Sequence, residues 1–246
     1  MKVFFEKLVQ YRNPSFRFDE SLTMGEILHF SFAQLVSLLR GSKLLFRFRN
    51  PKRMMAGRGV RFSFLSRVSW GSYFKPSDFV YIGAAGKKGI CIGNNVGIGA
   101  FSRLIVATSL NNIGEFITIG NNVGIGEFAY LGGAGGLGIG DDCIIGQYFS
   151  CHPENHFFNS PNELIRMQGV SREGISIGNN CWIGSKVTIL DGVTIGDGCV
   201  IAAGSVVNKS FPPDCVIGGV PAKLLKRRGK KTLAELMNLE YELLPA

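Results

Sequence analysis

The 246-residue sequence lacks any long uncharged apolar run, although 46% of its residues are hydrophobic and the mean hydropathy is +0.18. A membrane-spanning helix needs about 20 predominantly apolar residues, so none is predicted. Charged residues are scarce at 18%, and with this hydrophobic share a disordered chain is excluded. No Gly-x-y triplet runs through the chain, which excludes a collagen-like fold.

Histidine is rare and cysteine has no regular spacing. The three histidines are His29, His152 and His156, and none of the six cysteines belongs to a Cys-x-x-Cys pair. Such cysteines fit a reducing compartment. Glu6 and Lys7 interrupt the apolar N-terminal stretch, which argues against a secretory signal. We therefore expect a cytoplasmic protein, with the inner membrane surface as a more specific location.

Acidic residues are outnumbered, with 18 Asp+Glu against 27 Lys+Arg and a net charge of +9. This balance is compatible with nucleic acid, an anionic membrane surface or a phosphorylated ligand as partner. Because no nucleic-acid-binding module is recognisable, nucleic acid is the least favoured of the three.

Glycine, in contrast, is abundant. The chain has 33 glycines, about twice the usual ~7%, which indicates a turn-rich, mostly β fold of one domain with a decoration. Several segments repeat an aliphatic residue, a glycine, two turn-prone residues and a small residue: ICIGNNVGIG (90–99), ITIGNNVGIG (117–126), LGIGDDCIIG (137–146), ISIGNNCWIG (175–184) and VTIGDGCVIA (193–202).

The aliphatic position recurs every six residues, which matches neither the 3.6 period of a helix nor the 2.0 period of a strand. It indicates short strands that alternate with bends and stack as a solenoid. Three six-residue faces close one coil of 18 residues, and coils stack at ~4.8 Å. The predicted inward aliphatic residues form three series: Ile177, Ile183, Ile189, Ile195, Ile201 and Val207; Ile119, Ile125, Leu131 and Leu137; and Ile139, Ile145 and Cys151.

The small residue four places later should also point inward, as at Val123, Cys143, Cys181 and Cys199, so these cysteines are expected to be core thiols. The Asn, Asp and Gly between them tolerate left-handed backbone angles at the corners.

These repeats resemble those of the hexapeptide-repeat acyltransferases. The resemblance covers about 58–228 and implies an all-β, left-handed parallel β-helix that works as a homotrimer with active sites between subunits. Ile139 and Ile177 are 38 residues apart where one coil needs 18, so the excess should leave the prism as a loop around 152–174. Long loops on rigid scaffolds are usually functional.

Two segments flank the repeats. Residues 1–57 contain a predicted helix at 24–40, with a capping box at Thr23 and Glu26 and a stop at Gly41. Its apolar face should pack on the β-helix or, with the basic-aromatic stretch 43–53, contact a membrane surface; the face comprises Met24, Leu28, Phe32, Leu35 and Leu39. Residues 229–246 predict a short C-terminal helix.

Two histidines open the long loop. A neutral imidazole is the usual general base near pH 7. The His-Pro dipeptide at His152 resembles the catalytic segment of galactoside and maltose acetyltransferases, and the wider HPENHFF resembles enzymes that acetylate bacterial surface polysaccharides. The resemblance makes His152 the base and places His156 and Gln168 at the acceptor. His156 as base and Cys151 as nucleophile are the alternatives.

One feature departs from the galactoside-type pattern. Those enzymes carry an asparagine beside the catalytic histidine on a neighbouring coil, whereas the comparable stretch 130–138 (YLGGAGGLG) has no amide side chain. Backbone N–H groups of this stretch could stabilise the oxyanion instead. The departure also suggests an acceptor unlike a simple galactoside.

The segment 182–209 resembles the acetyl-CoA-binding coils of the family, and 218–228 resembles its C-terminal Gly-x-Pro-Ala-Lys element. Basic side chains there could meet the phosphates of the donor. By this resemblance the donor-binding residues are Trp182, Ser185, Ala203, Asn208, Lys209, Lys223 and Lys226.

The sequence thus predicts an acetyl-CoA-dependent O-acetyltransferase that modifies a sugar hydroxyl in surface polysaccharide synthesis, without a metal. A sugar amine, serine or an antibiotic is the alternative acceptor. A zinc hydratase on the same fold would need three histidine ligands, which His29 is badly placed to complete. A non-catalytic scaffold would not need the loop histidines and the donor-binding coils together.

Overall fold

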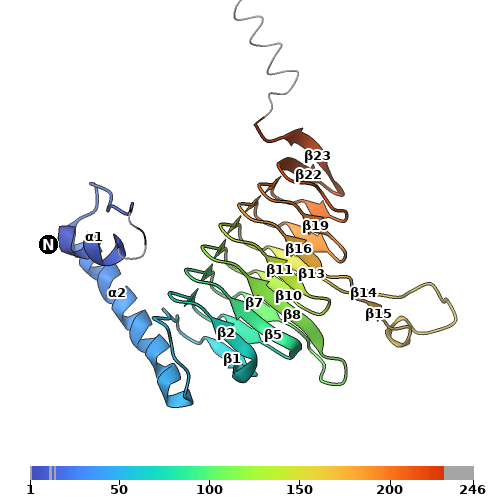
Figure 1. Ribbon diagram of the computed structural model, residues 1–246, viewed down its shortest axis with the longest axis horizontal. Coiled ribbons are helices and arrows are strands. Elements are labelled where there is room, and N and C mark those ends of the chain that lie inside the picture. Colours follow the sequence, from blue (N-terminus) through green and yellow to red (C-terminus); the bar gives the residue numbers. More distant parts are fainter. Residues whose placement is uncertain (1, 11–12, 14, 230–246) are drawn as a thin grey trace, which may run out of the picture.

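The computed structural model describes residues 2–10, 13 and 15–229. It shows a stack of parallel coils, with two helices along one side and a long loop projecting from the other (Figure 1). The predicted C-terminal helix falls, apart from Gly229, outside the described residues.

Three parallel sheets form the faces of the prism, and each coil contributes a short strand to each face. Sheet A comprises β1 (Arg61–Ser63), β4 (Tyr81–Gly83), β7 (Arg103–Ile105), β10 (Tyr130–Gly132), β13 (Ser150–His152), β18 (Thr188–Leu190) and β21 (Val206–Val207). Sheet B comprises β2 (Val68–Trp70), β5 (Gly86–Ile92), β8 (Gly114–Ile119), β11 (Leu137–Ile139), β16 (Ile175–Ile177) and β19 (Thr194–Ile195). Sheet C comprises β3 (Lys75–Pro76), β6 (Gly97–Ile98), β9 (Gly124–Ile125), β12 (Ile144–Ile145), β17 (Trp182–Ile183), β20 (Val200–Ile201), β22 (Cys215–Gly219) and β23 (Ala222–Arg227). The predicted β-helix is confirmed.

The six-residue period has the expected physical basis. Every aliphatic residue of the three predicted series is buried, and Ile189 and Leu131 are wholly inaccessible. The predicted core thiols Cys143, Cys181 and Cys199 are buried too. Burial of this continuous apolar column, at about 25 cal/mol per Å², is the main stabilising contribution.

The corner between sheets B and C is built from the paired turn residues of each repeat. The second residue of the pair adopts a positive φ, as at Asn122 and Asn180. The side chain of the first accepts a hydrogen bond from the backbone of an adjoining coil: the N–H of Asn121 donates to Asp141 Oδ1 (2.6 Å), and that of Asp141 donates to Asn179 Oδ1 (2.8 Å). The Asn/Asp pairs therefore supply both the left-handed angle and a ladder between coils.

The corner between sheets C and A holds an aromatic column that the sequence reasoning missed. Phe79, Phe101, Phe128 and Tyr148 all have positive φ, which is uncommon for bulky residues. Their rings stack at centroid distances of 5.1–5.2 Å. Stacking of this kind contributes about 0.5–1.5 kcal/mol per pair, which offsets the backbone cost.

Two insertions interrupt the coils where sheet A ends. Ile139 pairs with Ile177, 38 residues later, and the excess forms the predicted extruded loop (153–174), which carries β14 (Asn155–His156), η3 (Ile165–Met167) and β15 (Val170–Ser171). Ile92 pairs with Ile119, 27 residues later, and the shorter excess forms an unpredicted loop (106–113).

The N-terminal segment comprises α1 (Lys2–Gln10), α2 (Met24–Ser42) and η1 (Lys43–Arg47); η2 (Leu65–Arg67) lies inside the first coils. The predicted capping box of Thr23 and Glu26 is present. Gly41 does not end α2 as predicted, because it lies inside the helix and allows close contact with Met54. None of the helices described for this chain combines the length and apolar character that a membrane span requires.

The apolar face predicted to pack on the β-helix does not do so in this chain. Met24, Leu28, Phe32, Leu35 and Leu39 are all exposed. The prediction failed because the helix approaches the coils through its small residues instead.

The C-terminal end of the prism is closed by a reversal of the chain. β22 continues sheet C in parallel, beyond the point where the sequence period breaks, and β23 then returns antiparallel along it. This hairpin covers the backbone groups that the last coil would otherwise expose at an open edge.

Candidate functional site

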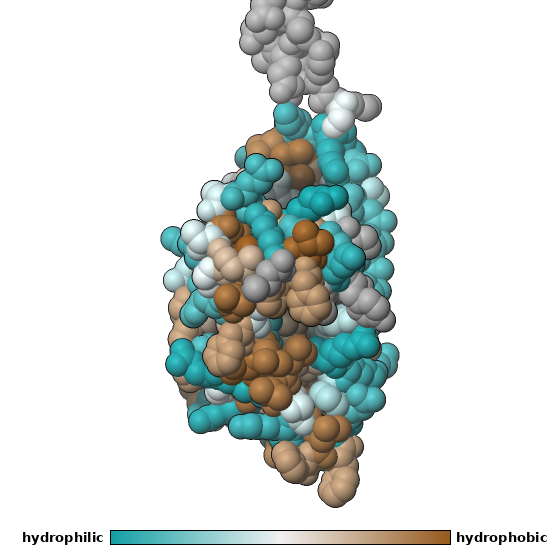
Figure 2. Space-filling view, turned by 90° about the vertical axis from the view of Figure 1, so that its left-hand side faces the viewer, coloured by the Kyte–Doolittle hydropathy of each residue, from teal (hydrophilic) through white to brown (hydrophobic). Residues whose placement is uncertain are grey.

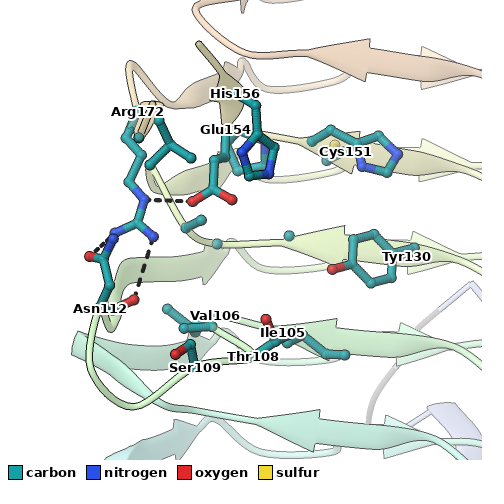
Figure 3. Close-up of a pocket in the computed structure, with 18 of the residues that line it drawn as sticks. Ile105, Val106, Thr108, Ser109, Asn112, Tyr130, Cys151, Glu154, His156 and Arg172 are labelled. Carbon is teal, nitrogen blue, oxygen red and sulfur yellow. Dashed lines mark hydrogen bonds and ion pairs between the residues drawn. The ribbon is translucent and has the colours of Figure 1, made fainter. Parts of the chain in front are cut away.

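A cavity of about 550 Å³ lies where sheet A ends, between the two insertions. Its floor is formed by strand ends β7, β10 and β13, and its walls by the extruded loop and the 106–113 loop (Figure 3). The polar side chains that line it are Thr108, Ser109, Asn111, Asn112, Tyr130, His152, Glu154, His156, Arg166 and Arg172.

His152 is the last residue of β13, and its ring stacks on Tyr130 of the neighbouring coil with centroids 5.5 Å apart and planes inclined by 18°. Partial desolvation lowers the pKa of His152 below its usual value of 6.5. Desolvation disfavours the charged imidazolium, so the neutral ring that a general base requires is favoured at pH 7.

Cys151, which precedes His152, cannot serve as a nucleophile in this geometry. Cys151 is fully buried, and its burial raises the pKa of the thiol well above the usual range. A thiol that stays protonated and points into the core is unreactive.

Arg172 joins the two walls of the cavity. Its Nε donates to Glu154 Oε2 at 2.7 Å, and its terminal nitrogens donate to Asn112 Oδ1 (2.9 Å) and to the backbone oxygens of Ile113 (3.2 Å) and Asn112 (3.4 Å). Figure 3 shows the guanidinium between Glu154 on the extruded loop and Asn112 on the shorter loop. Both charged side chains are mostly buried, at 20% and 29% exposure, so solvent screens the pair only in part.

The amide side chains that the stretch 130–138 lacks are provided from elsewhere. Asn111 and Asn112 line the cavity from the 106–113 loop. This loop follows β7, which is separated from β13 by β10. Gly132 and Gly133 line the cavity as well, so their backbone is also close to His152. The nine-residue excess between Ile92 and Ile119 was the signal that could have revealed this loop.

The two predicted acceptor-site residues have different surroundings. His156 lies on β14 and lines the cavity. Gln168 is not among the residues that line the cavity. Its Nε2 donates to the backbone oxygens of Ser160 and Glu163 (both 2.9 Å), and its Oε1 accepts from the Ser160 N–H (3.1 Å). Gln168 therefore holds the shape of the extruded loop.

Three of the predicted donor-binding residues lie on sheet C or at the corner where the strands of sheet A begin, whereas His152 lies where β13 ends. Trp182 is exposed on sheet C, and Ser185 and Ala203 lie at the corner between sheets C and A, where Ser185 Oγ donates to Gln147 Oε1 (2.7 Å). Gln147 lies in the turn before β13, and His152 is the last residue of that strand. One protomer thus keeps these residues apart from the cavity.

The remaining candidates lie near the C-terminal end of the prism. Asn208 and Lys209 follow β21, with Lys209 Nζ 5.6 Å from the centroid of the Phe211 ring. Lys223 and Lys226 are exposed on β23, opposite Gly218 and Val216 respectively.

Comparison with known families agrees with this architecture. Residues 174–209 match the family model described as bacterial transferase hexapeptide (six repeats). In this segment the chain is similar to hexapeptide-repeat acetyltransferases. Over 101 residues the chain is 33% identical to Escherichia coli (strain K12) WbbJ, whose name assigns it to O-acetyl transfer in lipopolysaccharide biosynthesis; the match covers 38% of this chain and 52% of WbbJ.

A second relative, the galactoside O-acetyltransferase of Escherichia coli (strain K12), is 34% identical over 92 residues, which are 36% of this chain and 42% of that enzyme. The chain thus spans about half the length of these curated relatives. Among solved structures, a mutant of AntD, an N-acyltransferase from Bacillus cereus, in complex with dTDP and coenzyme A, aligns with a TM-score of 0.49 and 24% identity over 77% of this chain and 91% of AntD.

Proposed function

We propose that this protein is a hexapeptide-repeat, acetyl-CoA-dependent O-acetyltransferase whose acceptor is a sugar hydroxyl, in the synthesis of a surface polysaccharide. The observation that carries the proposal is His152, a partly desolvated imidazole with a lowered pKa that lines a polar cavity. The similarity to galactoside O-acetyltransferase and to WbbJ supports a sugar acceptor.

The proposed step needs one base. His152 accepts the proton of the acceptor hydroxyl while that oxygen bonds to the thioester carbon of the donor. As the carbon–sulfur bond breaks, the imidazolium returns its proton to the leaving thiolate, so the enzyme ends in its starting state. The side-chain NH2 groups of Asn111 and Asn112 are available to bind the acceptor or the developing oxyanion, whereas the Gly133 N–H donates to the Ile105 carbonyl at 3.0 Å.

The proposed donor site uses the corner and the C-terminal hairpin. Trp182, Ser185 and Ala203 would line the pantetheine arm, with Asn208 and Lys209 further along it, and Lys223 and Lys226 would meet the phosphates. Because Ser185 lies at the corner where the strands of sheet A begin and His152 lies where β13 ends, the proposal includes a homotrimer in which the donor corner of one copy faces the cavity of the next.

The test is thiol release from acetyl-CoA in the presence of an acceptor panel: oligosaccharides, an amino sugar, serine and an aminoglycoside. We expect acceptor-dependent release with an oligosaccharide and its loss in His152→Ala, by 10²-fold or more, with an unchanged circular dichroism spectrum. Turnover that is near normal in His152→Ala would refute the assignment of the base, and turnover only with an amine would refute O-acetylation.

A further inference from the structure

A continuous apolar stripe runs along α2 and over η1 without any covering element among the residues that the structure describes. Leu28, Phe32, Leu35 and Leu39 follow one another at helical spacing and are 45–66% exposed. At the end of η1 the exposure rises to 87% for Phe46 and 98% for Phe48. Figure 2 shows this side of the molecule, where apolar side chains extend down to its lower end.

The stripe faces away from the β-helix because α2 contacts the coils through its other side. Gly41 packs against Met54, and the carbonyl of Ser37 accepts a hydrogen bond from the Ala56 N–H at 3.0 Å. Met54 and Ala56 are buried in the core of the prism. The helix is thus tied to the coils, and the apolar side is presented outward by a rigid body.

The charge along the C-terminal half of α2 and along η1 is mainly basic, although Asp78 lies near enough to Arg40 to interact with it electrostatically. Between Glu26 and Asp78 the sequence contains no acidic residue. Arg40, Lys43 and Arg47 alternate with the apolar residues at the C-terminal end of α2 and in η1. A second copy placed on this surface would bring like charges together, whereas an anionic surface would complement them.

We propose that α2 and η1 form an interfacial anchor for a bilayer that contains anionic phospholipid. The stripe enters the boundary between headgroups and acyl chains, and Arg40, Lys43 and Arg47 contact lipid phosphates. The inference goes beyond the proposed function and does not depend on it, since α2 lies on the opposite side of the prism from the extruded loop, which carries β14 and β15 (Figure 1) and forms one wall of the cavity.

The test is co-sedimentation of the full chain with vesicles of phosphatidylcholine alone or mixed with phosphatidylglycerol, at low and high salt. We expect binding to the mixed vesicles that weakens with salt. Phe32→Ser or Phe46→Ser should each weaken it by about tenfold, the value for one inserted aromatic side chain. Arg47→Gln should weaken it by about fivefold.

Matched controls lie on the far side of the molecule. Phe158, 71% exposed in the extruded loop, is a phenylalanine of similar exposure to Phe32, and Arg166 is an exposed arginine of the same loop. Phe158→Ser and Arg166→Gln should leave vesicle binding unchanged. Thiol release with a soluble acceptor and no vesicles should be the same in Phe32→Ser as in the unaltered chain, which separates this test from that of the proposed function.

Three results would overturn the anchor. The first is no sedimentation with mixed vesicles, and the second is equal weakening by Phe158→Ser and Phe32→Ser. The third is a change of oligomeric mass in Phe32→Ser without lipid, because it would mean that another copy of the chain covers the stripe. Equal binding to pure phosphatidylcholine would refute the role of the basic residues.

Discussion

The Arg172 contacts allow a quantitative test of how the cavity is held together. Arg172→Met keeps the aliphatic length of the side chain and removes the ion pair with Glu154 and the hydrogen bonds to Asn112 and Ile113. Hydrogen bonds to a charged group contribute about 1.5–3 kcal/mol when buried, and partial exposure of both partners reduces this. A net loss of about 2–3 kcal/mol is therefore expected.

This loss should act locally. Arg172 joins two insertions and no core residue, so the coils should keep their stability while the loops open more often. A cost of about 2–3 kcal/mol corresponds to about 30- to 150-fold faster amide hydrogen exchange in 107–113 and 155–171. Hydrogen exchange read by mass spectrometry measures this directly.

The matched control is Arg166→Met, the same change on the same exposed loop. It should leave exchange in 107–113 unaltered, since Arg166 makes none of the contacts that Arg172 makes to this loop. If Arg172→Met also leaves exchange in 107–113 at the level of the unaltered chain, the guanidinium does not hold the two walls together and the reasoning fails.

Three further predictions concern the base, the donor and the core. The midpoint of the acidic limb in the pH profile of kcat/KM should lie below pH 6.5, because desolvation lowers the pKa of His152 and activity needs the neutral ring. Tyr130→Ala should move this midpoint to higher pH, because it removes the ring that stacks on His152. A midpoint above pH 6.5 in the unaltered protein would contradict the assignment of His152 as the base. The double substitution Lys223→Glu and Lys226→Glu should raise KM for acetyl-CoA with little change in kcat. An unchanged KM would contradict the assignment of these residues to the donor site. Ile189→Ala should lower the free energy of unfolding in urea by about 2–5 kcal/mol, and a loss under 1 kcal/mol would contradict its place in the core.

The coils were predictable from sequence because each inward position repeats the same physical requirement. Ile183, Ile189 and Ile195 occupy equivalent places on three faces, so one pattern defines all of them. The Asn and Asp corners followed from their tolerance of left-handed angles. The extruded loop followed from a simple excess of length.

The rest depended on contacts that no repeat encodes. The aromatic column at Phe101 and Phe128 was missed because bulky side chains disfavour positive φ, and only their stacking across coils offsets this cost. Asn112 was missed because its loop comes from a coil that is not adjacent to β13. The helix face at Phe32 was expected to be buried, since an amphipathic helix beside a core normally packs through its apolar side.

The cavity walls and the residues proposed for the donor belong to different parts of the fold, and this separation affects how the protein can diversify. The walls of the cavity come from two segments that leave the prism at one edge and return to it, while the residues proposed for the donor belong to the coil corners and the terminal hairpin. Changes of length or composition in the insertions leave the inward aliphatic column untouched. A lineage with this architecture can therefore alter the walls of the cavity while it keeps the same coil corners and the same folding core.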